Sequence, residues 1–508
     1  MSIDSQLPAE LHAPVAERLR AAAEQNVARR IWERDGTLWA PAGTPEVTDR
    51  LGWLDIAERM AAELDELRGL AAAVRADGCT DAVLLGMGGS SLGPEVFRRS
   101  FGDGDVRLHV LDSTHPEQVG AVRDAIDLDR TLFVVSSKSG GTIETLSQFE
   151  YFHSLQGDGS HFVAVTDPGT SLARLGARHG FRRVFENDPE IGGRYSVLSY
   201  FGLVPAAIAG ADIGAVLRTA QEAMEACQRS GDNPGLQLGA ALGELALRGR
   251  DKLTFVVDAP LESFGLWAEQ LVAESTGKQG RGILPIADEP LVNASAYGDD
   301  RVFLHLASDD VEQAAKLAEL AAAGHPTFTV PVQGPADLGR IFFVSEFATA
   351  VAGWALGINP FDQPDVQEAK DNTARVLEHG APELEHGDLE ALLGGPVPPR
   401  YVAILAYLPY SAETDAAAAR LRERIVTRHG TATTFGYGPR YLHSTGQFHK
   451  GGPPTGAFVE LVDEPRQDVE VPGRPYTFAT LIRAQADGDL QTLRSHGLDA
   501  VRAGKENL

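Results

Sequence analysis

The sequence has few cysteines. Cys79 and Cys227 are the only two among its 508 residues, and they lie in unrelated contexts. They provide neither a disulfide framework nor the ligand spacing of a metal site. A chain of this length with 43% hydrophobic residues can bury a core of ordinary size without such crosslinks. The cysteine usage therefore favours a cytoplasmic compartment.

Long apolar runs and an excess of basic residues are also lacking. No uncharged apolar run approaches the ~18 residues that a membrane span needs, and the first residues, MSIDSQLPAELHAP, lack the basic and apolar regions of a signal peptide. The formal net charge is −26, which argues against nucleic acid because phosphate backbones need a basic footprint. In so acidic a protein, we expect a cation inside a Gly/Ser-rich turn to be placed for an anion.

The hydrophobic pattern divides the chain into four regions. Residues 1–76 have helical periodicity, as in LHAPVAERLRAAAEQNVARRIW. Residues 77–215 and 230–380 each alternate short apolar strands with helical stretches, which is typical of doubly wound parallel sheets. The stretch EHGAPELEHGDLEALLGGPVPP is the linker candidate, and RYVAILAYLP opens a smaller unit over 400–508. The predicted class is α/β.

The first polar loop is LLGMGGSSLGP, where a strand runs into glycines and serines before a helix. Gly88 and Gly89 would let backbone N–H groups approach an anion, and the hydroxyl of Ser90 could donate to it. The loop is close to a dinucleotide fingerprint, with Asp112 in the place of the ribose-binding acid, but Ser91 stands where the third glycine belongs. A plain strand-to-helix turn is the alternative.

The second loop is VVSSKSGGTIET, which follows the next buried strand but one. It offers four hydroxyls, including those of Ser137, Ser139 and Thr142, with the ammonium of Lys138 and two glycines. This donor set at the carboxyl end of a strand suits a phosphate monoester. Because a dinucleotide enzyme has no use for a second phosphate loop, we expect a phosphate cradle here rather than a solvated loop.

Two further segments offer groups for acid–base chemistry. In EIGGRYSVLSYFGL, Arg194 follows two glycines and could be a fixed cation for an oxyanion, or a solvated surface arginine. In LWAEQLVAESTGKQGRGILP, the spacing predicts a helix that stops at Gly277, with Glu274 in or just past its last turn. A carboxylate there opposes the helix macrodipole, which favours proton uptake and suits a general base. A surface ion pair with Lys278 or Arg281 is the alternative.

A fifth segment, GINPFDQPDVQEAKDNTARVL, predicts a helix that starts at Pro364, after Asp362 and Gln363. Lys370 would lie about two turns into this helix. Because a single helical lysine normally faces solvent, the residues alone assign it no role.

Taken in order, these segments resemble the glucose-6-phosphate isomerase family over about residues 80 to 375. The similar motifs are GMGGSSLGP, SSKSGGTIET, GGRYS, ESTGK and NPFDQPDVQEAK. The resemblance implies two sugar-isomerase (SIS) domains in tandem, with a helical N-terminal segment and a small C-terminal α/β domain. It also implies reversible isomerisation of glucose 6-phosphate and fructose 6-phosphate through a cis-enediol, in glycolysis and gluconeogenesis, without a cofactor or metal.

The resemblance further implies a role for each matching residue. Glu274 would pass the proton between C1 and C2, and Arg194 would steady the cis-enediolate. Gln363 would contact the sugar or its ordered water, and Lys370 would assist ring opening. The substrate-binding residues carried over by motif are Gly88, Gly89, Ser90, Ser137, Lys138, Ser139, Thr142 and Gly193.

The ring-opening histidine of the family is displaced in this sequence. Arg301 stands where many members have that histidine, and His305 falls inside an apolar strand, where a core histidine is expected. In the C-terminal unit, LHSTGQ is similar to a segment of some bacterial isomerases, so we predict that His443 opens the ring. A loop histidine without a role, or a metal site with His449, are the alternatives.

The C-terminal unit also resembles that of bifunctional chains in which an isomerase of this branch follows a transaldolase. The isomerase-like segments begin near residue 80, which leaves no room for a TIM barrel of ~250 residues. We therefore expect no transaldolase activity.

Other functions remain open from the sequence. The chain could be an isomerase of another hexose phosphate, such as mannose 6-phosphate, or a phosphosugar-binding regulator on the same fold. A regulator would not need Glu274, Gln363 and Lys370 together. The resemblance implies a possible homodimer in which the partner supplies the histidine, although His443 on an appended domain could serve its own chain.

Overall fold

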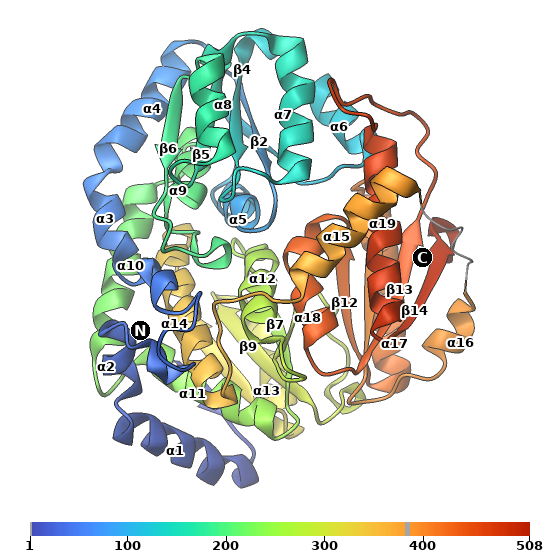
Figure 1. The fold of residues 1–508 in the computed structure, drawn as a ribbon. Coiled ribbons are helices and arrows are strands. Elements are labelled where there is room, and N and C mark those ends of the chain that lie inside the picture. Colours follow the sequence, from blue (N-terminus) through green and yellow to red (C-terminus); the bar gives the residue numbers. More distant parts are fainter. Residues whose placement is uncertain (1–2, 381–386) are drawn as a thin grey trace.

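Three β-sheets with helices packed around them form the architecture of the chain (Figure 1). The computed structural model describes residues 3–380 and 387–508, with the backbone alone at 366, 367, 369 and 370. Two sheets have five strands and one has four, and neighbouring strands are parallel in all but one pairing. The predicted α/β class with parallel sheets is confirmed.

The first sheet is built from the apolar runs predicted for residues 77–215. Its strands are β2 (Asp81–Gly86), β3 (Arg107–Leu111), β4 (Thr131–Ser136), β5 (Phe162–Thr166) and β6 (Arg183–Glu186), in the order β3-β2-β4-β5-β6. The three central strands are buried along their whole length. Alternate residues face opposite layers, because Leu84 packs toward α5 (Leu92–Phe101) while Leu85 packs toward α7 (Ile143–Gln156).

The second sheet includes a strand from the start of the chain. Its members are β7 (Lys252–Val257), β8 (Leu284–Ile286), β9 (Arg301–Ala307), β10 (Thr327–Pro331) and β1 (Asp4–Gln6), in the order β1-β10-β9-β7-β8. β1 pairs antiparallel with β10 at the sheet edge. The sequence predicted only helices for residues 1–76 and so missed this strand. Its three residues, DSQ, are exposed and lack the alternation of apolar residues that marks a strand.

Helices from two parts of the chain cover this second sheet. α12 (Phe264–Thr276) and α14 (Leu338–Leu356) are almost wholly buried, and α14 packs against α10 (Ile213–Gln228) and α11 (Pro234–Leu247). The N-terminal helices are α1 (Ala9–Glu24), α2 (Val27–Trp32), α3 (Ile56–Ala62) and α4 (Leu64–Ala76). Figure 1 shows these helices, in blue, along one side of both larger sheets.

The third sheet belongs to the C-terminal unit. Its strands are β11 (Tyr401–Tyr407), β12 (Ala432–Tyr437), β13 (Gly456–Val462) and β14 (Asp499–Gly504), in the order β12-β11-β13-β14. α17 (Ala412–His429) and α19 (Phe478–Ser495) lie on opposite faces, as Leu421 packs with Val402 while Ile482 packs with Ala403. α15 (Val366–His379) packs along α19 and joins this unit to the second sheet (Figure 1).

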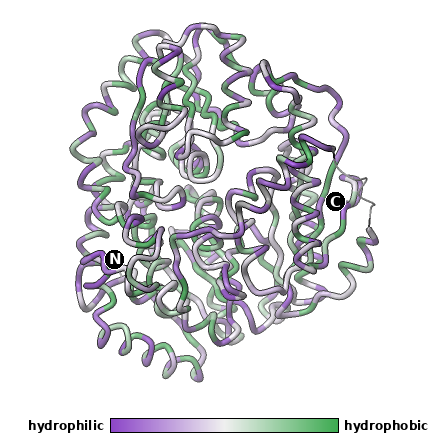
Figure 2. The backbone as a smooth tube through the Cα atoms, in the orientation of Figure 1, coloured by the Kyte–Doolittle hydropathy of each residue, from purple (hydrophilic) through white to green (hydrophobic). Residues whose placement is uncertain are grey.

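The hydropathy of the chain follows this layered arrangement. Figure 2 shows hydrophobic segments inside the molecule and hydrophilic segments along much of its outline. Cys79 and Cys227 are both buried and unpaired. Within the described ranges, every helix is too short or too polar to cross a bilayer.

Candidate functional site

The glycine–serine loop after β2 lies against two other loops. A Cβ on Gly89 would lie 2.0 Å from the carbonyl oxygen of Gly193, so the loop and the arginine turn can touch only through glycine. Gly88 has a φ of +55°, and a Cβ there would lie 2.9 Å from the carbonyl oxygen of His443. Glycines therefore bring three distant segments of the chain into contact, and Ser90 follows them, buried, at the end of the same turn.

Arg194 is a buried cation held by four acceptors. Only 2% of the residue is exposed. Its Nε donates to Ser275 Oγ (2.9 Å) and its Nη1 to Gln363 Oε1 (2.7 Å), while its Nη2 donates to the carbonyl oxygens of Pro360 and Asp362, both at 2.9 Å. The guanidinium thus joins the segment that carries Glu274 to the FDQ segment, and it is not a solvated surface group.

Glu274 lies in the last turn of α12, one helical turn beyond Gln270. Its Oε1 lies 3.6 Å from Arg194 Nη1, and its Oε2 accepts a hydrogen bond of 3.1 Å from Gln270 Nε2. The same amide nitrogen lies beside Gly88, 3.0 Å from where a Cβ would stand. The carboxylate therefore has one oriented donor and one fixed cation.

The alternative of a surface ion pair for Glu274 does not match this geometry. Lys278 is buried and donates to the carbonyl oxygen of Asn359 (2.9 Å) and to Asp362 Oδ1 (2.6 Å), while Arg281 donates to the carbonyl oxygen of Leu356 (2.6 Å). Burial, with the charge of Arg194 as a second cause, lowers the pKa of Lys278 to about 8, although Asp362 opposes this shift. Lys278 therefore braces the FDQ segment and Arg281 the end of α14, so the cation beside Glu274 is Arg194.

The second polar loop has the geometry of an anion cradle. Ser137 Oγ and Thr142 Oγ1 lie 2.8 Å apart, and the N–H of Gly141 donates to Ser139 Oγ (3.3 Å). Thr142 is the N-cap of α7, whose N-terminus favours a negative charge. Ser139, Gly141 and Thr142 line a cavity of about 720 Å³ together with His443.

The cation of this loop is directed elsewhere. Lys138 Nζ forms an ion pair with Asp167, which follows the neighbouring strand β5, and donates to the carbonyl oxygen of Pro189 (3.1 Å). Among the described residues that line the cavity, Lys138 is absent. The expectation that the ammonium faces the phosphate is therefore not matched, because a carboxylate from the next strand attracts it.

His443 reaches this cavity from the C-terminal unit. Its Nε2 lies 3.0 Å from Oε1 of Glu144, in the first turn of α7. Gln485 Nε2 donates to the same oxygen (2.7 Å), and its own Oε1 accepts from Thr114 Oγ1 (2.6 Å). Because the carboxylate only accepts, this network favours a proton on Nε2 and leaves Nδ1 as the acceptor nitrogen of His443.

Gln447, one turn after His443, ties the histidine segment to the rest of the site. Its Nε2 donates to the carbonyl oxygen of Gly277 (3.0 Å) and to Asp365 Oδ2 (2.6 Å), and its Oε1 accepts from the N–H of Asp365 (3.0 Å). A Cβ on Gly277 would lie 2.4 Å from Phe448 Cα. The short helix α18 (Gly446–Gly451) is therefore seated directly on the end of the helix that carries Glu274.

Three other residues considered in the sequence analysis are His305, His449 and Lys370. His305 is a core histidine, as expected, with Nε2 2.8 Å from Asp258 Oδ1. His449 is buried with Nδ1 2.9 Å from the hydroxyl of Tyr401, and burial lowers its pKa to about 3. Lys370 lies on α15, but its side chain is outside the described residues, and the helix begins at Val366 rather than at Pro364.

Several residues of the site were not predicted from the sequence. Gln270 stands four residues before Glu274, on the same helical face, and Glu144 stands two residues after Thr142. Gln447 lies inside the LHSTGQ motif itself. The spacing of four residues from Glu274 could have found Gln270, and closeness in sequence to Thr142 and His443 could have found Glu144 and Gln447. The contacts of Ser275 and Gln485 depend on the tertiary fold.

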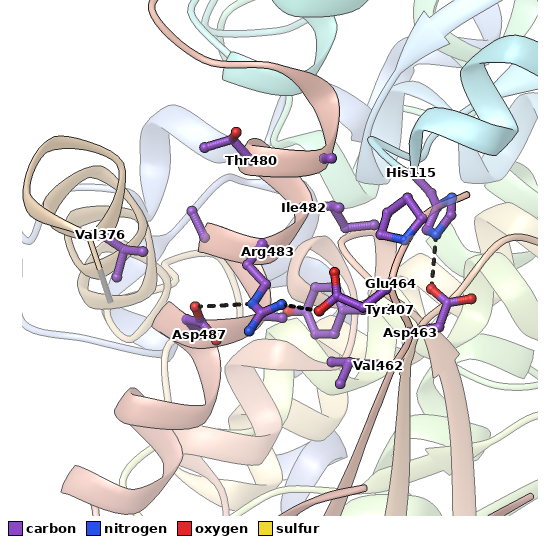
Figure 3. Close-up of a pocket in the computed structure, with 15 residues that line it drawn as sticks. His115, Val376, Tyr407, Val462, Asp463, Glu464, Thr480, Ile482, Arg483 and Asp487 are labelled. Carbon is purple, nitrogen blue, oxygen red and sulfur yellow. Dashed lines mark hydrogen bonds and ion pairs between the residues drawn. The ribbon is translucent and has the colours of Figure 1, made fainter. Parts of the chain in front are cut away.

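A second cavity, of about 330 Å³, lies where β11 and β13 end (Figure 3). His115 lies 3.2 Å from Asp463, and Arg483 pairs with Glu464 (2.6 Å) and with Asp487 (3.8 Å). Figure 3 shows these charged groups turned toward one another. The charges of this second cavity are thus largely compensated by pairs within it. Its lining includes none of the predicted site residues that the structure describes.

Comparisons with known proteins relate the chain to phosphoglucose isomerases. The phosphoglucose isomerase family model matches residues 54–281. A glucose-6-phosphate isomerase of Rubrobacter xylanophilus is 31% identical over 355 residues, which cover 58% of this chain and 82% of the relative. A glucose-6-phosphate isomerase of Thermus thermophilus is 30% identical over 419 residues, which cover 72% of this chain and 95% of the relative.

A solved structure has the same fold. The crystal structure of a glucose-6-phosphate isomerase from Chlamydia trachomatis superposes with a TM-score of 0.62 at 20% identity, over 72% of this chain and 86% of that one. Both of the relatives named above are at least 30% identical to this chain and are matched over most of their own length. The chain therefore belongs to the phosphoglucose isomerase family.

Proposed function

We propose that this protein interconverts glucose 6-phosphate and fructose 6-phosphate, the isomerisation step of glycolysis and gluconeogenesis. The observation that carries the proposal is the carboxylate of Glu274 held between Gln270 and the buried guanidinium of Arg194. A hydrogen next to a carbonyl is only weakly acidic, so its removal needs a positioned base and a cation that shares the growing charge on oxygen.

The residues divide the reaction between them. The loop with Ser137, Ser139 and Thr142 holds the phosphate, whose binding energy is remote from the reacting carbons. As the sugar ring opens, His443 Nδ1 takes the proton of the O1 hydroxyl and delivers it to the ring oxygen when the C1–O5 bond breaks, and Lys370 assists. Glu274 then takes the proton from C2 of the aldose and returns it to C1, while the hydroxyl proton moves between O2 and O1. We propose no cofactor or metal for this chemistry.

Two contacts favour a role for Gln363 and Gly193 in placing Arg194. Gln363 Oε1 accepts directly from the guanidinium, and Gly193 precedes it in the turn that touches Gly89. In this proposal, Arg194 faces the cis-enediolate while Gln363 keeps it in place. A phosphosugar-binding regulator would need the phosphate loop but not this arrangement around Glu274.

The test is a coupled assay of fructose 6-phosphate conversion to glucose 6-phosphate, with mannose 6-phosphate as the competing substrate. Glu274→Gln should abolish exchange of the C2 hydrogen of glucose 6-phosphate with solvent. A Glu274→Gln variant that exchanges at the wild-type rate would contradict the role of Glu274. Faster turnover of mannose 6-phosphate would favour an isomerase of another hexose phosphate.

Four further points about this protein are also proposals. We infer that the chain belongs to the branch that resembles the isomerase part of transaldolase–isomerase chains, on the evidence of LHSTGQ and the C-terminal unit. We propose domains at 1–76, 77–215, 230–380 and 400–508. We also propose a cytoplasmic location and a possible homodimer, neither of which the geometry of the site requires.

A further inference from the structure

We propose that His443 serves Glu274 of its own chain, so that a single chain carries a complete active site. This inference rests on the proposed isomerase function. It concerns the origin of the histidine, which the chemistry alone does not determine, and it follows from how the C-terminal unit (residues 400–508) is seated on both larger sheets.

The C-terminal unit is attached to the first sheet domain by polar contacts, several of which lie around the cavity that holds His443. His443 bonds to Glu144, and Gln485 bonds to Glu144 and Thr114. Arg474 donates twice to the carboxylate of Glu150, at 2.7 Å each. Three further contacts link Tyr410 to Asp112, Tyr476 to Ser147 and His115 to Asp463, the last of which Figure 3 shows.

The same unit is attached to the second sheet domain by buried contacts. Arg422 donates to the carbonyl oxygens of Ala287 and Asp288, both at 2.8 Å, although only 3% of it is exposed. Glu289 accepts from the N–H (2.8 Å) and the hydroxyl (2.7 Å) of Thr433. Undocking would leave these buried groups without partners, which costs roughly 1–3 kcal/mol for each neutral group and more for each charge.

α15 and the residues before it link the segment that contains His443 to the part of the chain that carries Glu274. Asp365, the N-cap of α15, bonds twice to Gln447, and the preceding Asp362 bonds to both Arg194 and Lys278. Further along the helix, Asn372 Nδ2 donates to Thr492 Oγ1 of α19 (2.7 Å). The FDQ segment, α15 and the C-terminal unit therefore form one continuous packed structure that places His443 against Gly88.

The first experiment tests the docking without relying on catalysis. Glu150→Cys and Arg474→Cys replace an ion pair that spans the two units at the surface, and the two native cysteines are buried. With a short bismaleimide, the double variant should give a crosslinked monomer, and an equimolar mixture of the two single variants should give no covalent dimer. Covalent dimers from the mixture of single variants would overturn the proposal.

The second experiment tests the functional part. Glu274→Gln and His443→Ala chains are refolded together and assayed. A site within one chain predicts no activity beyond the sum of the two variants. A site shared across a dimer interface would restore about one quarter of the wild-type activity, because half of the random dimers are mixed and each has one intact site. Such recovery would overturn the proposal.

The two experiments separate this inference from the proposed function. If the wild-type protein fails to isomerise fructose 6-phosphate, the function is wrong, whereas the crosslinking still decides whether the C-terminal unit docks on its own chain. If the wild type is active and the mixture recovers activity, the function stands and the single-chain site is wrong.

Discussion

His443 Nε2 lies 3.0 Å from Glu144 Oε1, although 299 residues separate the two in sequence. Glu144 belongs to the helix that begins at the phosphate loop, and His443 belongs to the C-terminal unit. A carboxylate that accepts from an imidazole N–H fixes the orientation and the tautomer of the ring. This pair therefore connects the loop that we assign to phosphate binding with the histidine that we assign to ring opening.

Glu144→Gln should weaken ring opening without affecting enolisation. A neutral amide at 144 removes the carboxylate that orients the His443 ring, so we expect kcat on glucose 6-phosphate to fall by roughly 10–100-fold, which is typical for loss of support to general acid–base catalysis. An open-chain analogue of the substrate should be turned over at nearly the wild-type rate.

The controls for this prediction are two further variants. Glu225→Gln changes an exposed glutamate of α10 and should leave both rates unchanged. His443→Ala should reproduce the selective loss on the cyclic substrate with a larger magnitude. An equal loss on the cyclic and open-chain substrates would contradict the ring-opening role of His443.

Gln447→Glu should lower kcat and the free energy of unfolding more than Gln447→Ala does. The Gln447 amide donates to the carboxylate of Asp365 and to the carbonyl oxygen of Gly277, so a carboxylate at 447 would face two acceptors. We expect kcat to fall more than KM rises in both variants, since Gln447 positions other groups. Urea unfolding should show a further loss of about 1–3 kcal/mol for Gln447→Glu relative to Gln447→Ala.

An exposed glutamine supplies the comparison for Gln447. Gln228→Glu, at the end of α10, adds the same charge away from the site and should change neither kcat nor the free energy of unfolding by more than about 0.5 kcal/mol. Equal stability of the Gln447→Glu and Gln447→Ala variants would show that the amide is not bound as described.

Arg194→Lys should be a severe substitution despite the retained charge. The guanidinium satisfies four acceptors in a fixed plane, and one ammonium cannot reach Ser275, Gln363 and the two carbonyl oxygens together. We expect kcat to fall by about 100-fold or more, with a lowered melting temperature. Arg218→Lys, at an exposed arginine of α10, is the control, and near-normal kcat for Arg194→Lys would rule out the planar clamp.

His449 should make the protein sensitive to acid. Burial, helped by the neighbouring Lys450, lowers its pKa from 6.5 to about 3 in the folded state. Between these values the unfolded chain binds a proton that the folded chain does not, so the free energy of unfolding rises from about pH 3 to 6.5 and falls as the solution is acidified through this range. The contribution of this one residue is up to about 5 kcal/mol.

The acid effect can be isolated by substitution. His449→Gln keeps a polar group for the Tyr401 hydroxyl but does not titrate, so the variant should lose less stability than the wild type between pH 6.5 and pH 4. Urea unfolding at several pH values measures this difference. His12→Gln, at an exposed histidine, should follow the wild-type curve, and an identical acid loss in His449→Gln would contradict the assignment of a neutral core histidine.

Local patterns predicted most of the parallel strands and the helix end at Gly277, because buried strands and glycine stops leave a signal in neighbouring residues. β1 left no such signal, since its pairing with β10 depends on an edge strand more than 300 residues away. The orientation of Lys138 was equally hidden, because its partner Asp167 follows a different strand. What the sequence could not supply was the tertiary neighbour of each charged group.

The pairing of β1 with β10 also constrains how the protein is made. Asp4 faces Thr329, so at roughly 5–20 residues per second the first strand emerges from the ribosome roughly 15–65 s before its partner. His443 follows later still. During translation, β1 therefore stays unpaired until β10 has been made, and the active site that we propose stays incomplete until the residues around His443 have left the ribosome.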